Sequence, residues 1–261
     1  MTTAFKLIVE YDGTDYSGWQ VQNDVPTIQG EIEKVLQRIT GQSIRVSGSG
    51  RTDAGVHALA QVAGFVCKTK LSVTQLHKGL NSLLPSDIVI HSLEPVPAAF
   101  HPRYDVISKI YRYRILNRKW PDAILRCYAW QLRRQLDIDA MAVAARHLLG
   151  CHDFKAFEGV GSPRSSTVRN ILSASITRQE SDLMVFEVKA DGFLRFMVRN
   201  IVGTLVDVGL SRISSDDFLR VLASRDRSQA GPTAPPMACF WSGYSMKNRE
   251  RLHDPFAMAH L

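Results

Sequence analysis

The sequence predicts an α+β fold built from two similar halves, each with the element order β-α-β-β-α-β that characterises RRM and ferredoxin-like domains. The first observation is periodicity: apolar residues alternate in short segments and recur at helical spacing in longer ones, in the same order twice. The second is size, because 261 residues suffice for two ordinary domains. The third is composition, since 45% hydrophobic and 22% charged residues are typical of a soluble folded protein.

The first half supplies the pattern most clearly. Its strands are predicted at residues 5–11, 44–47, 59–67 and 88–93. Its helices are predicted at residues 27–40 and 72–84. Thr27 offers capping chemistry and Gly41 stops the first helix, while Ser72 caps the second and Pro85 closes it.

The second half repeats the order with longer connections. Its strands are predicted at residues 108–117, 168–178, 183–190 and 239–246. Its helices are predicted at residues 137–149, 194–208 and 215–223. The Pro- and Gly-rich run at 231–236 breaks the chain before the last strand.

These elements predict a domain organisation. We expect an N-terminal domain at 1–105, a C-terminal domain at 106–247 and a tail at 248–261. If each half builds an antiparallel sheet with helices on one face, the two halves form one extended, mainly antiparallel sheet with a cleft between them. Such junctions commonly hold substrate sites.

Positive charge is concentrated at this junction. The chain carries a net charge of +7, and the segment from Arg103 to Arg134 alone holds nine basic and two acidic residues. Aromatic residues interleave with these charges: Tyr104, Tyr111, Tyr113, Trp120, Tyr128 and Trp130. The pattern suits a polyanion with stackable bases, although a solvated strand face with core aromatics fits this segment equally well.

Other classes of protein are disfavoured. No stretch approaches the roughly 20 apolar residues that span a bilayer, and the N-terminus resembles no signal peptide, so we expect a cytoplasmic protein with no membrane contact. The four cysteines are scattered, which favours free thiols. His147, Cys151 and His152 lack further ligands, so no metal is expected.

Three segments carry candidate chemistry. The loop Gly48–His57 places Asp53 two residues from Arg51 among three glycines, although a turn in which Asp53 bonds its own backbone is an alternative. Alternation in residues 108–114 puts Lys109, Tyr111 and Tyr113 on one strand face, where a tyrosine can stack an RNA base or fill a core. In the third segment, residues 191–203, Arg195 and Arg199 are spaced to share a helical face; an arginine buried there needs a partner such as Asp53.

Together these segments resemble the tRNA pseudouridine synthase A family from about residue 5 to residue 246. The resemblance runs through six motifs in order: Tyr11–Gln20, Gly50–Ala58, Phe100–Tyr104, Lys109–Tyr113, His152–Phe154 and Phe196–Asn200. It implies an isomerase that converts uridine to pseudouridine at positions 38, 39 and 40 of the tRNA anticodon stem-loop, usually as a homodimer. No cofactor is implied, since the reaction oxidises nothing.

The resemblance also implies roles for individual residues. Asp53 is the catalytic carboxylate, acting as a nucleophile or as a base that yields a glycal. Tyr111 stacks on the uracil and assists proton transfer at C5, and Arg199 pairs with Asp53. Arg51 holds the displaced nucleotide. Further RNA contacts are expected from the basic segment, at Arg103, Lys109 and Arg112.

Two features depart from the family. Pro236-Met237-Ala238-Cys239 replaces the glycine and leucine that usually follow the Ala-Pro pair, and the tail has no counterpart. Three other functions stay open: a non-catalytic tRNA-binding module, a nucleoside hydrolase that requires a second acid near Asp53, and a structural protein.

Overall fold

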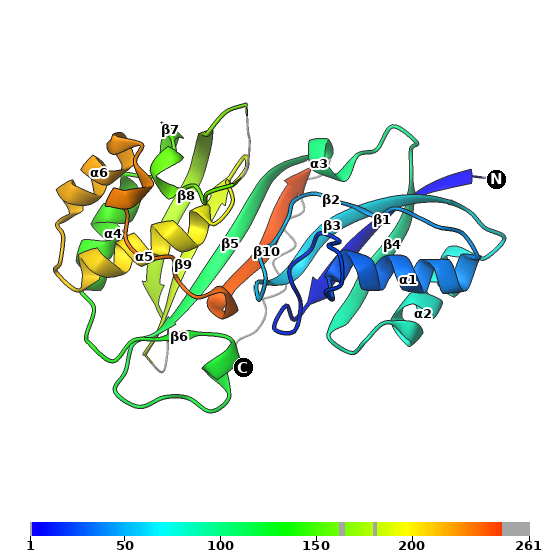
Figure 1. Ribbon diagram of the computed structural model, residues 1–261, viewed down its shortest axis with the longest axis horizontal. Coiled ribbons are helices and arrows are strands. Elements are labelled where there is room, and N and C mark those ends of the chain that lie inside the picture. The colour runs from blue at the N-terminus through cyan, green and yellow to red at the C-terminus, as the bar shows by residue number, and fades with distance from the viewer. Residues whose placement is uncertain (1, 162–164, 180–181, 247–261) are drawn as a thin grey trace. The chain divides into compact units, whose positions relative to one another are not determined.

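The chain divides into two compact units in a computed structural model that describes residues 2–161, 165–179 and 182–246 (Figure 1). Of the described residues, unit 1 comprises 2–107 and 240–246, and unit 2 comprises those between 108 and 239. Both contain a sheet and helices, which confirms the α+β class. No helix within the described ranges is long and apolar enough to cross a membrane.

Unit 1 is built on a mainly antiparallel sheet. Its strands are β1 (Thr2–Tyr11), β2 (Ser47–Gly48), β3 (His57–Lys68), β4 (Ile88–Val96) and β10 (Cys239–Met246). The order is β4-β1-β3-β10, with β2 paired to β3. Strand β1 runs antiparallel to both neighbours, whereas β10 runs parallel to β3 and aligns Phe240 with His57.

Two helices cover one face of this sheet (Figure 1). Helix α1 (Ile28–Thr40) begins where the Thr27 hydroxyl accepts a hydrogen bond from the Gly30 N–H, and it ends at Gly41, which has a φ of 70°. Helix α2 (Val73–Leu83) begins at a capping box of Ser72 and Gln75. A short helix, α3 (Pro102–Asp105), precedes unit 2. The predicted caps are therefore confirmed.

Unit 2 has its own antiparallel sheet. The strands are β5 (Val106–Leu116), β6 (Trp130–Gln131), β7 (Gly150–Asp153), β8 (Val168–Arg178) and β9 (Leu183–Ala190). Their order is β5-β9-β8-β7, and β6 pairs in parallel with the end of β5. The first two residues of β5 belong to unit 1.

The helices of unit 2 are α4 (Ile138–Arg146), α5 (Met197–Gly209) and α6 (Ser215–Ser224). Helix α4 packs on β8 and contacts the other two helices (Figure 1). Eleven of the thirteen residues of α5 are buried, so this helix forms the centre of the unit. Single 3-10 turns complete the unit: η1 (Leu125–Cys127), η2 (Lys155–Phe157), η4 (Arg227–Gln229) and η5 (Pro236–Ala238).

Four sequence expectations differ from the structure. The strand predicted at 44–47 is only Ser47–Gly48, and strands β6 and β7 were not predicted. Helix α5 begins at Met197 rather than 194, because Phe196 adopts a left-handed conformation with a φ of 61°. Strand β10 belongs to unit 1 from Phe240 onward, although the expected boundaries put it in the second domain. The proposed tail at 248–261 lies outside the described residues.

Candidate functional site

The Asp53 loop connects β2 to β3 in unit 1. Arg51 is exposed, Asp53 is half-buried and Thr52 between them is buried. The loop turns back at Gly55, which has a φ of 74°, and the Val56 N–H bonds to the carbonyl oxygen of Asp53 at 3.2 Å. The sequence motif therefore forms a tight loop between two strands, as predicted.

The segment Tyr11–Trp19 braces this loop from one side. The Tyr11 hydroxyl lies 2.8 Å from the Thr52 hydroxyl, and the Trp19 N–H bonds to the Thr52 carbonyl oxygen at 3.2 Å. Gly18 is required here, because a Cβ atom on it would lie 2.5 Å from that carbonyl oxygen. Burial raises the pKa of Tyr11 well above its ordinary value, so its hydroxyl remains a neutral hydrogen-bonding group.

The end of the loop is anchored by His57. Its imidazole is buried, accepts a hydrogen bond from the Gly13 N–H at 3.1 Å, and stacks on the ring of Phe240 with 4.7 Å between centroids. Gly13 has no room for a side chain, since a Cβ atom would lie 2.1 Å from the Val56 carbonyl oxygen. The two ends of the Asp53 loop are therefore fixed to the sheet of unit 1.

In unit 2, Tyr111 lies on β5 opposite Val188 of β9. It is 8% exposed, and its ring meets the Phe193 ring edge to face at 5.0 Å. Tyr113 is fully buried and donates its hydroxyl to the Pro235 carbonyl at 2.7 Å, so it is a core residue. Of the two tyrosines that alternation placed on one face, only Tyr111 keeps any exposed surface.

Arg199 lies in the first turn of α5. Its Nε donates to the Ala234 carbonyl at 2.7 Å, and the Ala234 N–H donates to the Arg199 carbonyl at 3.1 Å. The guanidinium groups of Arg199 and Arg195 lie over the Phe196 ring, at 5.0 and 4.6 Å from its centroid. Arg195 precedes α5, so the expectation that both arginines share a helical face is wrong. They share a ring instead.

Two further residues of α5, a polar one and a glycine, hold this arrangement and were not predicted. Asn200 is fully buried; its amide donates to the Phe157 carbonyl at 2.8 Å and accepts from the Thr233 hydroxyl at 2.6 Å. Gly203 lets the segment 231–234 pass close to α5, because a Cβ atom there would lie 1.7 Å from the Pro232 carbonyl oxygen. An asparagine and a glycine inside an apolar helix were the available signals.

The other predicted RNA-binding residues differ in their surroundings. Arg112 forms a cross-strand ion pair with Glu187, with 2.7 Å from Nε to Oε2. Arg103 lies in α3 of unit 1 with its guanidinium 5.9 Å from the centre of the Tyr104 ring. Lys109 lies on β5 opposite Ala190. The sequence-predicted residues are thus spread over both units, with Arg51, Asp53 and Arg103 in unit 1.

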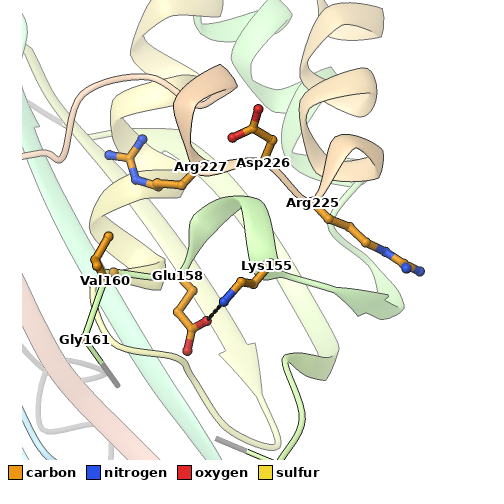
Figure 2. Close-up of a pocket in the computed structure, with 8 residues that line it drawn as sticks. Lys155, Glu158, Val160, Gly161, Arg225, Asp226 and Arg227 are labelled. Atoms are coloured by element: carbon orange, nitrogen blue, oxygen red, sulfur yellow. Dashed lines mark hydrogen bonds and ion pairs between the residues drawn. The ribbon is translucent and has the colours of Figure 1, made fainter. Parts of the chain in front are cut away.

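A cavity of about 390 Å³ in unit 2 contains none of these residues (Figure 2). In Figure 2 the Lys155 ammonium meets the Glu158 carboxylate at 2.8 Å, while Arg225 extends away from them. Arg227 is held by Asn200 and Thr233, each at 3.1 Å. Because none of the residues predicted to act on RNA lines it, this cavity is not the candidate active site.

Comparison with solved structures finds weak likenesses of fold. The solved structure of an archaeal box H/ACA sRNP Nop10–Cbf5 complex matches with a TM-score of 0.32 and 12% identity, over 87% of this chain and 60% of that chain. A likeness at this level supports no inference about this protein.

Sequence comparison identifies the family. The family described as tRNA pseudouridine synthase matches residues 7–105 and 144–242. The tRNA pseudouridine synthase A of Thermoanaerobacter sp. (strain X514) is 44% identical over 234 residues, which are 90% of this chain and 96% of that protein. The protein of the same name from Moorella thermoacetica is 46% identical over 232 residues, 88% of this chain and 94% of its own. The chain belongs to the tRNA pseudouridine synthase family.

Proposed function

We propose that this protein isomerises uridine to pseudouridine at positions 38, 39 and 40 of the tRNA anticodon stem-loop, with Asp53 as its catalytic carboxylate. The observation that carries the proposal is the Asp53 loop, whose backbone is fixed on both sides while Asp53 itself stays half-buried. A rigid loop that displays one carboxylate suits a reaction that needs a single ionised group in a fixed position.

The chemistry accounts for the choice of residue. The bond between N1 of uracil and C1′ of ribose breaks, C5 forms a new bond to C1′, the proton on C5 leaves, and N1 gains a proton. No atom is oxidised and no water is consumed. A carboxylate can begin this sequence as a nucleophile or by removing a ribose proton, and water must be excluded while sugar and base are separated.

Tyr111 and Arg199 complete the proposed machinery. The Tyr111 ring packs edge to face against Phe193, and its hydroxyl is the proposed participant in proton transfer at C5. The Arg199 guanidinium is oriented by the Ala234 carbonyl and the Phe196 ring, and a cation in the site favours the ionised form of a carboxylate. Arg51, exposed beside Asp53, holds the displaced nucleotide through its phosphate.

The wider RNA contact is proposed for Arg103, Lys109, Arg112 and the rest of the basic segment 103–134. Its outer loop presents Trp120, which is 70% exposed, with the Lys119 ammonium 5.1 Å from the centre of the indole ring. Exposed tryptophan beside lysine suits stacking on an unpaired base together with neutralisation of a phosphate.

We further propose that the protein works as a homodimer in the cytoplasm. Sedimentation can test the oligomeric state, and cell fractionation can test the location.

Position-specific mapping of pseudouridine tests the proposal. A tRNA transcript with uridine at positions 38, 39 and 40 is compared with three transcripts in which one of these uridines is cytidine. Modification at the remaining uridines, with no free uracil, is the expected result. Release of free uracil would indicate a hydrolase. Tight binding without either product would indicate the non-catalytic RNA-binding module.

A further inference from the structure

A buried glutamine lies beneath the Asp53 loop, at the point where the loop leaves the sheet. Gln61 is on β3 opposite Val9 of β1 and is 0% exposed. Its side-chain Nε2 donates to the Gly50 carbonyl at 2.8 Å, and its Oε1 accepts from the Ser49 hydroxyl at 2.9 Å. Both groups of the amide are therefore used by two consecutive residues of the loop.

At Gly50 the backbone hydrogen bonds between β2 and β3 end, and a side chain supplies the next hydrogen bond. Strand β2 pairs Ser47 and Gly48 with β3, and the Ser49 N–H still bonds to the Val62 carbonyl at 2.8 Å. The next carbonyl, that of Gly50, is bonded by the Gln61 side chain instead. Gln61 thus fixes the first residue after the ladder, one position before Arg51 and three before Asp53.

The second anchor of the loop lies two residues further on. Thr52 is bonded through its hydroxyl to Tyr11 and through its carbonyl to the Trp19 N–H. The two candidate residues, Arg51 and Asp53, therefore each follow an anchored residue. With only the Thr52 anchor, Gly50 would be free to rotate, since glycine has the widest range of backbone conformations.

We propose that Gln61 is a positioning residue for catalysis: with Ser49 it forms a buried clamp on Gly50 that sets the placement of Arg51 and Asp53. The proposal rests on the proposed function of Asp53 and adds the residue that holds it in place. Gln61 acts through the loop backbone, so its loss lowers turnover and leaves tRNA binding by the basic segment intact. A half-buried carbonyl that loses its donor shifts to find another donor or water.

Two isosteric substitutions separate positioning from general stability. Methionine matches glutamine in length but has no amide, so Gln61→Met removes the clamp. Gln29→Met is the matched control: Gln29 is 2% exposed, lies in the same unit, and its amide bonds to Glu33 and the Val21 and Val46 backbones. Ser49→Ala removes only one hydroxyl, and it provides a test if Gln61→Met fails to fold.

The experiment measures kcat, tRNA Kd and amide hydrogen exchange for each variant. We expect Gln61→Met to lower kcat by roughly 10- to 100-fold with Kd within about twofold, and Ser49→Ala to lower kcat by roughly three- to tenfold. Ser49→Ala should have little further effect on kcat in the Gln61→Met background, because both remove one clamp. Gln29→Met should keep kcat near that of the wild type.

Exchange within the loop separates this proposal from the proposed function. Faster exchange at residues 50–56 in Gln61→Met, but not in Gln29→Met, is expected even if the wild-type protein proves inactive on tRNA, in which case only the function of Asp53 fails. The proposal of a clamp is overturned if hydrogen exchange in the loop is unchanged in Gln61→Met. It is equally overturned if Gln61→Met or Ser49→Ala keeps full kcat, or if Gln29→Met loses kcat to the same extent as Gln61→Met.

Discussion

Arg199 is oriented by one neighbour that lies far from it in sequence, Ala234, and by one that lies close to it, Phe196. Its Nε bonds to the Ala234 carbonyl, and its guanidinium lies over the Phe196 ring. Phe196 itself has a φ of 61°, a conformation that costs a non-glycine residue energy and that the surrounding structure must stabilise. A planar guanidinium can meet both neighbours at once, whereas an ammonium group cannot.

Replacing Arg199 with lysine should therefore reduce catalysis even though the charge is kept. We expect Arg199→Lys to lower kcat/KM by about 100-fold, the size of effect seen when a catalytic group is displaced by about 1 Å. Arg195→Lys is the control, because Arg195 packs on the same ring but precedes the helix. Single-turnover kinetics on tRNA measure both. Equal losses in the two variants would argue against a specific role for Arg199.

Helix α5 is the element that links fold to site in unit 2. It is almost entirely buried, it carries Arg199 in its first turn, and Gly203 lets the segment 231–234 approach its backbone. That close approach brings the Ala234 carbonyl to Arg199. The hydrogen bond between Thr233 and Asn200 holds the same segment against the helix. Packing of this helix therefore decides the placement of Arg199, the side chain for which we propose a catalytic role.

Adding one methyl group to this contact should be costly. Gly203→Ala places a Cβ atom 1.7 Å from the Pro232 carbonyl oxygen, so we expect it to destabilise the protein by about 3 kcal/mol. Gly79→Ala in α2 is the control; its Cβ atom would meet only the flexible end of Ile39 at 3.2 Å, and it should be neutral or slightly stabilising. Urea unfolding measures both variants. Wild-type stability in Gly203→Ala would contradict this packing.

The stability of helix α6 is expected to depend on pH through its N-terminal cap. The Asp217 carboxylate accepts hydrogen bonds from the backbone and hydroxyl of Ser214 and from Arg220, which lowers the pKa of Asp217 to about 2. A lowered pKa means that this stabilisation is complete above the ordinary value of 3.8 and is lost as the pH falls towards 2. The difference in Tm between wild type and Asp217→Asn should therefore shrink from pH 6 to pH 3. A difference that stays constant would exclude the ionised cap.

At the scale of the whole chain, most of the fold could be predicted from sequence, and the exceptions have physical causes. Strands β8 and β9 were predicted to the residue because alternation and turn residues are local signals. The membership of β10 in unit 1 was missed because it depends on long-range pairing with β3. The start of α5 was missed because tertiary packing, not local propensity, holds Phe196 in its conformation.

The candidate site divides in the same way. Asp53, Tyr111 and Arg199 could be named because their motifs resemble a known family. Their spacing alone was equally compatible with a simple turn or with core packing. The role that we propose for Gln61 had no signal in the sequence, whereas Asn200 was marked only by being an asparagine in an apolar helix. A buried glutamine acquires its role only when register places it beneath the loop.

The charge distribution of the whole molecule predicts a steep salt dependence of tRNA binding. If the basic segment makes four or more phosphate contacts, raising salt from 50 to 200 mM should weaken binding by roughly 100-fold or more. Lys119→Gln should reduce the slope of log affinity against log salt by about one. Arg38→Gln, an exposed arginine on α1 outside that segment, should leave it unchanged. A flat response would contradict the proposed RNA surface.

The proposed role of Asp53 in uridine isomerisation is best tested by tritium release from tRNA labelled at C5 of uracil. Wild-type protein and Asp53→Asn, which is nearly identical in shape, are compared at equal tRNA occupancy. We expect release by the wild type and loss of release in the variant, with tRNA affinity kept within about twofold, because phosphate contacts dominate affinity. Release by Asp53→Asn at the wild-type rate would contradict the assignment of Asp53, and absence of release by the wild type would contradict the proposed function.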